Sequence, residues 1–157
     1  MILLAACSGS GDSGTPTSPA ASPLVVSNAA VFVGTQDVSG TTMPVGHNMG
    51  GTTRFEARMT MPMPSGAPTD MWVHYDRPGT MGMMGESGTV RMYDDGTHGD
   101  HTPGDGLYCL DDDRTGSQEI GCHGADAPMG TYHYEFYATE ASHESNHVRV
   151  TVTVVGG

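Results

Sequence analysis

The feature that most constrains the fold is an alternation of apolar and polar side chains with a period of two. Between positions 53 and 61, every second residue from Phe55 to Met61 is apolar, whereas the residues from Arg54 to Thr60 that lie between them are polar or charged. The same alternation recurs at 70–75, 131–139 and 147–155. Because successive side chains of a strand point to opposite faces of a sheet, this pattern predicts half-buried antiparallel strands.

Three further segments have the composition of strands and complete a set of about seven: 24–33, 89–93 and 106–110. No segment combines the period and the length of an amphipathic helix. Short strands at this density in roughly 130 residues predict an all-β fold, a single antiparallel β-sandwich over residues 24–157.

An unusually acidic segment separates two of the predicted strands. Residues 94–108 contain four carboxylates and four glycines. Carboxylates at this density repel one another unless a cation neutralises them, and glycine lets the backbone fold around such a cation. The segment therefore predicts a site for a hard metal ion, Ca²⁺ in the first place, in a long β-hairpin connection. The alternative is a Gly/Asp-rich hairpin whose carboxylates cap main-chain amides without metal.

The acidic segment also resembles a known family. Residues 94–108 match the pattern Asp-Asp-Gly-x-x-Gly-Asp-x-x-x-Gly-Asp-Gly-x-Tyr found in bacterial immunoglobulin-like or fibronectin-III-like modules of exported proteins, and residues 130–140 resemble their penultimate strand. The resemblance covers about residues 89–155. It implies an Ig-like sandwich with an adhesive, spacer or accessory role and a calcium-stabilised turn. The ligands that it implies are Asp95, Asp100 and Asp105, with Asp94 second.

The amino terminus resembles a lipoprotein signal. Residues 4–7, Leu-Ala-Ala-Cys, match the lipobox of bacterial lipoproteins, in which the cysteine is lipidated and becomes the new amino terminus. Only six residues precede Cys7 and none is Lys or Arg, whereas a working signal has a charged start and a longer apolar run. Residues 1–6 are therefore expected to be the remnant of a signal that was truncated or whose true start lies upstream. Residues 7–23 are predicted to be the lipidated cysteine and a flexible Gly/Ser/Pro tether. Ser8 then implies anchoring to the outer membrane or cell surface; the alternative is a chance cysteine in a frayed terminus.

The other two cysteines are predicted to pair. With Cys7 carrying lipid, Cys109 and Cys122 remain for a disulfide in an oxidising compartment. Such a bridge closes a short loop and stabilises a fold by roughly 3 kcal/mol on the loop-entropy model. Free thiols or a metal-binding pair are the alternatives.

Residues 143–147 read His-Glu-Ser-Asn-His, which is formally the zinc-protease signature His-Glu-x-x-His. That chemistry needs a helix, which places both histidines on one face beside the glutamate. Here the five residues are expected to join two strands as a turn. A zinc hydrolase built on His143 and His147 is therefore the weaker alternative.

Methionines concentrate in the middle of the chain, where ten of the twelve lie between Met43 and Met92. Clustered thioethers near imidazoles suit Cu(I). An exported copper-binding protein that uses Met81, Met83 and Met84 in their Gly-rich loop is therefore the main alternative function. The methionines expected to fill the core instead are those on predicted inward faces: Met59, Met61, Met71 and Met92.

Charge excludes some classes of partner. The chain has 18 acidic against 6 basic residues, a net charge of -12, which would repel nucleic acid and anionic lipid. The acidic run at 111–113 is expected to be solvated. No nucleophile–base pair or phosphate-binding loop is present in the sequence. The prediction is a non-catalytic, lipid-anchored module of the bacterial cell surface that calcium stabilises and that has a structural role or binds a protein or glycan.

Overall fold

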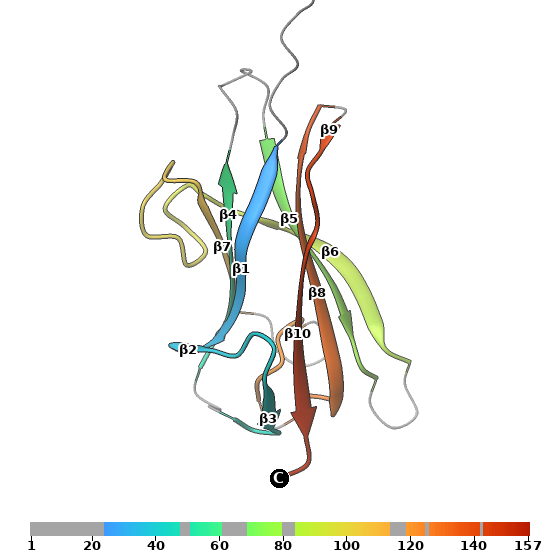
Figure 1. Cartoon of the computed structure of the whole chain (residues 1–157). Helices are drawn as coiled ribbons and strands as arrows, with labels where there is room; N and C mark the ends of the chain where they lie inside the picture. Colours follow the sequence, from blue (N-terminus) through green and yellow to red (C-terminus); the bar gives the residue numbers. More distant parts are fainter. Residues whose placement is uncertain are drawn as a thin grey trace, which may run out of the picture.

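The chain forms two β-sheets that pack face to face (Figure 1). The computed structural model describes residues 24–47, 51–60, 69–79, 84–113, 119–124, 126–141 and 143–157. Within these ranges the elements are ten strands and no helix. The prediction of an all-β sandwich is therefore confirmed.

The two sheets differ in size. One has four strands in the order β2-β1-β4-β7, and the other has six, in the order β3-β10-β8-β5-β6 with β9 beside β8. The strands are β1 (Val25–Val33), β2 (Gln36–Asp37), β3 (Thr42–Pro44), β4 (Thr53–Thr60), β5 (Thr69–Arg77), β6 (Glu86–Met92), β7 (Leu107–Asp112), β8 (Gly130–Glu140), β9 (His143–Glu144) and β10 (Val148–Val155).

Each predicted strand corresponds to one of the seven longer strands, whereas β2, β3 and β9 were not predicted. These three contain two or three residues each, too few to show an alternation. One pairing also differs from the predicted antiparallel arrangement. The short β3 runs parallel to β10, so the larger sheet is mixed.

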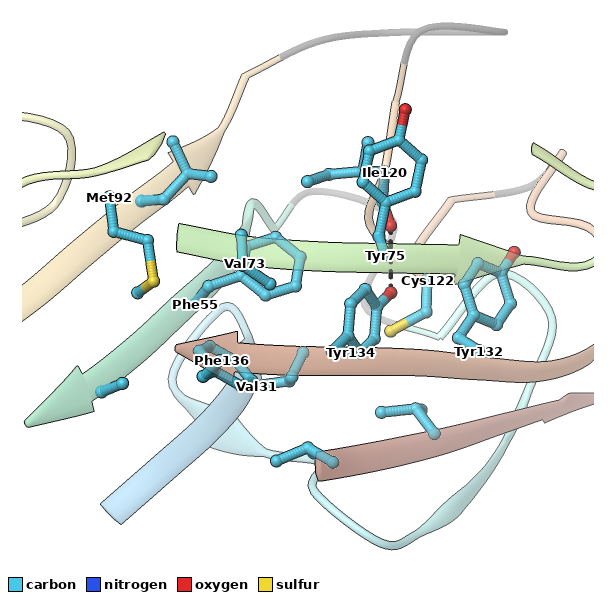
Figure 2. Packing of buried hydrophobic residues seen from close by; sticks show 14 of the residues in the cluster. Val31, Phe55, Val73, Tyr75, Met92, Ile120, Cys122, Tyr132, Tyr134 and Phe136 are labelled. Atoms are coloured by element: carbon cyan, nitrogen blue, oxygen red, sulfur yellow. Dashed lines mark hydrogen bonds between the residues drawn. The ribbon is translucent and has the colours of Figure 1, made fainter. Parts of the chain in front are cut away.

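The core lies between the inward faces that the alternation predicted. Along β4 and β8 the residues of one face are all buried: Phe55, Ala57, Met59, Tyr132, Tyr134, Phe136 and Ala138. The ring centroids of Phe55 and Tyr134, which come from opposite sheets, are 4.9 Å apart (Figure 2). Burying an aromatic side chain stabilises a fold by about 2–3 kcal/mol, so these rows hold the two sheets together.

A polar contact anchors the segment 119–124 to the core. The Tyr134 hydroxyl donates a hydrogen bond of 3.0 Å to the carbonyl of Ile120 (Figure 2). At the end of β7, Asp112 Oδ2 accepts hydrogen bonds from the main-chain N–H groups of Ile120 and Gly121, each at 2.8 Å. A Cβ atom at Gly121 would collide with the side chain of Thr53, so this segment lies directly against β4.

A second polar contact joins the two sheets where β1 begins. Asn146 Oδ1 accepts from Val26 N, and Asn146 Nδ2 donates to Val26 O, both at 2.9 Å. The side-chain amide therefore takes the place of a neighbouring strand for β1. Because Asn146 lies between β9 and β10, it links the smaller sheet to the larger one.

The predicted disulfide between Cys109 and Cys122 is wrong, because both cysteines are free and buried. Leu110 pairs with Phe55 and belongs to the core. The preceding residue, Cys109, therefore points to the opposite, outer face of the smaller sheet. Cys122 lies inside the core beside Tyr134 (Figure 2). The two sulfurs thus lie on opposite sides of a sheet, where no bridge can form without moving β7. Burial raises the pKa of each thiol to about 12.

Candidate metal centre

The acidic loop, residues 94–106, connects β6 in the larger sheet to β7 in the smaller one, so the predicted hairpin connection is wrong. The two segments meet at an isolated bridge between Tyr93 and Cys109. Tyr93 exchanges two main-chain hydrogen bonds with Cys109, of 2.9 and 2.8 Å, and Asp111 N donates to the carbonyl of His98 at 2.8 Å. The first part of the loop is thereby held along the free side of β7. Gly99 has a φ of +90°, and a Cβ atom there would lie 2.5 Å from Asp111 Oδ1. Only glycine fits this close approach.

Three of the four predicted metal ligands converge within this loop. Asp94, Asp100 and Asp105 each offer a carboxylate oxygen, and these oxygens all lie within 4.8 Å of one another. Asp100 is buried with 5% of its surface exposed, Asp94 is half-buried and Asp105 is exposed. Asp95 is not in the cluster. Its Oδ1 instead accepts hydrogen bonds from the N–H and hydroxyl of Thr97, at 3.0 and 2.5 Å, which closes a local turn.

Main-chain amides orient all three carboxylates. Asp94 accepts N–H groups from Gly104 and Asp105 on Oδ1 and from Gly106 on Oδ2. Asp100 accepts from Gly96 and Thr102. Main-chain N–H groups therefore hold the loop in shape without a metal ion. The metal-free alternative, in which the carboxylates cap main-chain amides, requires these same contacts.

The amide bonds leave capacity for a cation. An ionised carboxylate has about four acceptor positions. The main-chain bonds described occupy three on Asp94, two on Asp100 and one, from Leu107, on Asp105. The donor set consists of hard oxygens, which suits Ca²⁺ better than softer metals.

Electrostatics also favour a cation at this position. The amides of Thr102 and Gly96 lower the pKa of Asp100, so its carboxyl is ionised at neutral pH. At 4.8 Å, two unit charges repel by about 0.9 kcal/mol in water and about 3.5 kcal/mol at an effective dielectric constant of 20. The main-chain amides already offset this repulsion at Asp100, and a bound cation would offset it further.

The zinc-protease signature does not form a helix. His143 and Glu144 form β9, which pairs with Thr139 and Glu140 of β8. The predicted turn is correct only in part: the segment lies between β8 and β10, but its first two residues form a strand, β9. Ser145 is buried and its Oγ accepts from Ala138 N at 2.8 Å, so the segment is fixed by contacts within the sheet.

His147, the second histidine of that signature, has neighbours of its own. Its ring stacks on Tyr137 with centroids 4.8 Å apart and planes 6° apart. Its Nε2 is 2.8 Å from Glu144 Oε1, and its Nδ1 is 3.3 Å from Glu135 Oε1. The hydrogen bond with Glu144, reinforced by Glu135, raises the pKa of His147. These contacts place both ring nitrogens against carboxylates of the same surface.

The methionines that the structure describes are either buried or exposed. Met59, Met71 and Met92 are buried in the core, as predicted, and so is Met43. The other methionine predicted to fill the core, Met61, and two of the three proposed copper ligands, Met81 and Met83, lie outside the described residues. The remaining one, Met84, is 96% exposed.

Sequence reasoning missed two polar residues that hold the fold. Asp112 lies in the acidic run expected to be solvated, yet it is only 2% exposed. The signal was present, because Asp112 is two residues after Leu110 and so shares its inward face. Asn146 gave no such signal, because its partner Val26 is 120 residues away in sequence.

The amino-terminal features remain untested by the structure, since Cys7 and the tether lie outside the described residues. No helix in the described ranges is long and apolar enough to cross a membrane. Comparison of the chain with protein-family models, curated proteins and solved structures finds no match.

Proposed function

We propose that the chain is a non-catalytic β-sandwich module, exported and anchored by lipid at Cys7, whose acidic loop binds Ca²⁺. The observation that carries the metal site is the convergence of Asp94, Asp100 and Asp105 within 4.8 Å. The sandwich supplies a rigid support for this loop, and the module's role is structural or is the binding of a protein or glycan at the cell surface.

Calcium would act on the stability of the loop. Ca²⁺ takes 6–8 oxygen ligands, so three carboxylates would supply part of its coordination and main-chain carbonyls and water the rest. The ion would offset the mutual repulsion of the carboxylates. Because the loop is held to β7 through Tyr93 and His98, calcium binding would also stabilise that edge of the smaller sheet.

Thermal unfolding with and without metal tests the site. The chain is melted after chelation and again with Ca²⁺, Zn²⁺ or Cu(I) added back. A ligand that binds only the folded state stabilises it by about 2.7 kcal/mol at a hundredfold excess over Kd, so calcium should raise the midpoint by several degrees. The shift should vanish in Asp100→Asn and persist in Asp95→Asn, whose carboxylate is outside the cluster.

The same assay separates the alternatives. No calcium shift in the native chain would refute the proposed metal site. A copper shift that is lost on replacing Met81, Met83 and Met84 together would favour the copper-binding function. A zinc-dependent hydrolase would show an activity that Glu144→Gln removes.

The lipid anchor is supported by residues 4–7 and by the tether that follows them. Growth of cells that express the gene with a labelled fatty acid should give a labelled protein, because the lipobox cysteine is acylated. The label should be lost in Cys7→Ser and kept in Ser8→Ala. A protein that carries no label, or keeps it without Cys7, would refute the anchor.

A further inference from the structure

In the part of the chain that the structure describes, most of the long strand edges are covered. Edge strands offer unpaired main-chain groups to other chains, and proteins block them with side chains, prolines or covering segments. Asn146 and Ser39 bond to the outer edge of β1, and Tyr93 and His98 cover that of β7. The three-residue β3, which ends in Pro44, covers part of β10.

In the described residues, strand β6 is covered at one end alone, where Tyr93, the residue directly after it, bridges to Cys109 of β7. It forms one margin of the larger sheet, with β5 as its neighbour in the strand order (Figure 1). Its seven residues pair with β5 without a bulge and contain no proline, and their charged members are Glu86 and Arg91. Among the described residues it is therefore the long strand left open to a further strand.

Strand geometry shows which groups face this open edge. Tyr93, directly after β6, exchanges both its main-chain bonds with Cys109, on the side away from β5. Residues of a strand direct their N–H and C=O groups alternately to its two edges. Ser87, Thr89 and Arg91 therefore present theirs to the open edge, whereas the residues between them face β5.

We propose that β6 pairs antiparallel with β6 of a second copy of the chain, around a twofold axis at Thr89. This register uses the main-chain groups of Ser87, Thr89 and Arg91 in both copies. It places Thr89 opposite Thr89, a favourable cross-strand pair, and Ser87 opposite Arg91. It also places the half-buried Val90 opposite Gly88, where no side chain competes for space.

Local charge on β6 does not oppose this antiparallel register, although each copy has a net charge of -12. The two charged residues of β6 have opposite signs, and both are neutralised within the chain: Glu86 by Arg77 and Arg91 by Asp70, each at 2.7 Å. The acidic loops begin five residues beyond Thr89. They would lie at opposite ends of the joint, about 33 Å apart along the strands. This separation is well beyond the Debye length of about 8 Å at physiological salt.

A cysteine at the twofold axis tests the register. Residues directly opposite in a hydrogen-bonded antiparallel pair have Cα atoms about 5.5 Å apart, within disulfide range. In a Cys7→Ser background, Thr89→Cys should form a covalent dimer in a mild redox buffer. The control is Thr151→Cys, an exposed site on β10 of the same sheet, which should stay monomeric. Cys109 and Cys122 are buried and should not contribute. Equal cross-linking at both sites would overturn the proposal.

Sedimentation of the full chain under reducing conditions tests the association itself. A single strand pair lies below the roughly 1,200 Å² of stable interfaces, so the concentration series must extend to the millimolar range. The native chain should dimerise more at high salt, which screens the residual repulsion. Thr89→Pro, which removes an N–H from the open edge, should abolish the dimer, and Thr89→Val should keep it. A monomer under all conditions, or a dimer in the proline variant, would overturn the proposal independently of calcium binding.

Discussion

Asp112 offers the sharpest test of how polar contacts hold this sandwich. Its Oδ2 alone accepts two amide hydrogen bonds, from Ile120 and Gly121, and the residue is 2% exposed. Asp112→Ala would leave two buried N–H groups without their acceptor. A buried unsatisfied group costs about 1–3 kcal/mol, so the free energy of unfolding should fall by about 2–6 kcal/mol. This is a large share of the roughly 5–15 kcal/mol of a typical domain.

Asp112→Asn separates hydrogen bonding from charge. The asparagine carbonyl can still accept both N–H groups, but neutral hydrogen bonds have roughly half the strength of charge-assisted ones. The expected loss is about 1–2 kcal/mol, clearly less than for alanine. Asp113→Ala, at the exposed neighbouring position, should stay within about 0.5 kcal/mol of the native value.

Urea unfolding followed by circular dichroism, with chelator present, measures all three variants. The free energy of unfolding should fall most in Asp112→Ala, less in Asp112→Asn and least in the control, Asp113→Ala. An alanine variant as stable as the native chain would show that the two amides do not depend on Asp112. If Asp112→Asn is as unstable as Asp112→Ala, the charge of Asp112, and not the position of its acceptor oxygen, holds the segment 119–124.

Three other perturbations have expected outcomes. Gly99→Ala should destabilise the acidic loop and abolish the calcium shift in the melt, because its φ is +90° and its Cβ would meet Asp111. The raised pKa of His147 means that its contribution to stability is present below about pH 6.5, the usual value, and is lost as pH rises through the folded-state pKa. Urea unfolding at a series of pH values should therefore show a fall in stability above pH 6.5 that is smaller in His147→Gln. Tyr134→Phe should lower the free energy of unfolding by about 1–3 kcal/mol, since a buried carbonyl loses its donor; an unchanged urea midpoint would contradict that.

The strands and their buried faces could be predicted because alternation is a local property. The inward residues of β4 and β8, from Phe55 to Phe136, follow directly from it. The partners of each strand could not be predicted in this way. The parallel pairing of β3 with β10 joins residues more than 100 positions apart, and no local pattern records it.

The candidate site was predicted in composition more than in geometry. Asp94, Asp100 and Asp105 converge, but Asp95 turns away to Thr97, because a loop built from left-handed glycines has no fixed period. The cysteine error has a different origin. The count of cysteines and an oxidising compartment favoured a disulfide. However, Cys109 directly precedes the inward-facing Leu110 in β7, and alternation along the strand places it on the outer face.

The two free thiols, Cys109 and Cys122, can report on two different opening motions of the molecule. Cys109 faces the side of β7 over which the acidic loop folds, whereas Cys122 is enclosed between the sheets. Movement of the acidic loop alone would admit a thiol reagent to Cys109, whereas exposure of Cys122 requires release of the segment 119–124 from its contacts with Asp112 and Tyr134. With each pKa at about 12, labelling at neutral pH would await such openings. The two labelling rates would therefore report the opening of the acidic loop and of the segment 119–124 separately, and a cation in the loop should slow the labelling of Cys109 far more than that of Cys122.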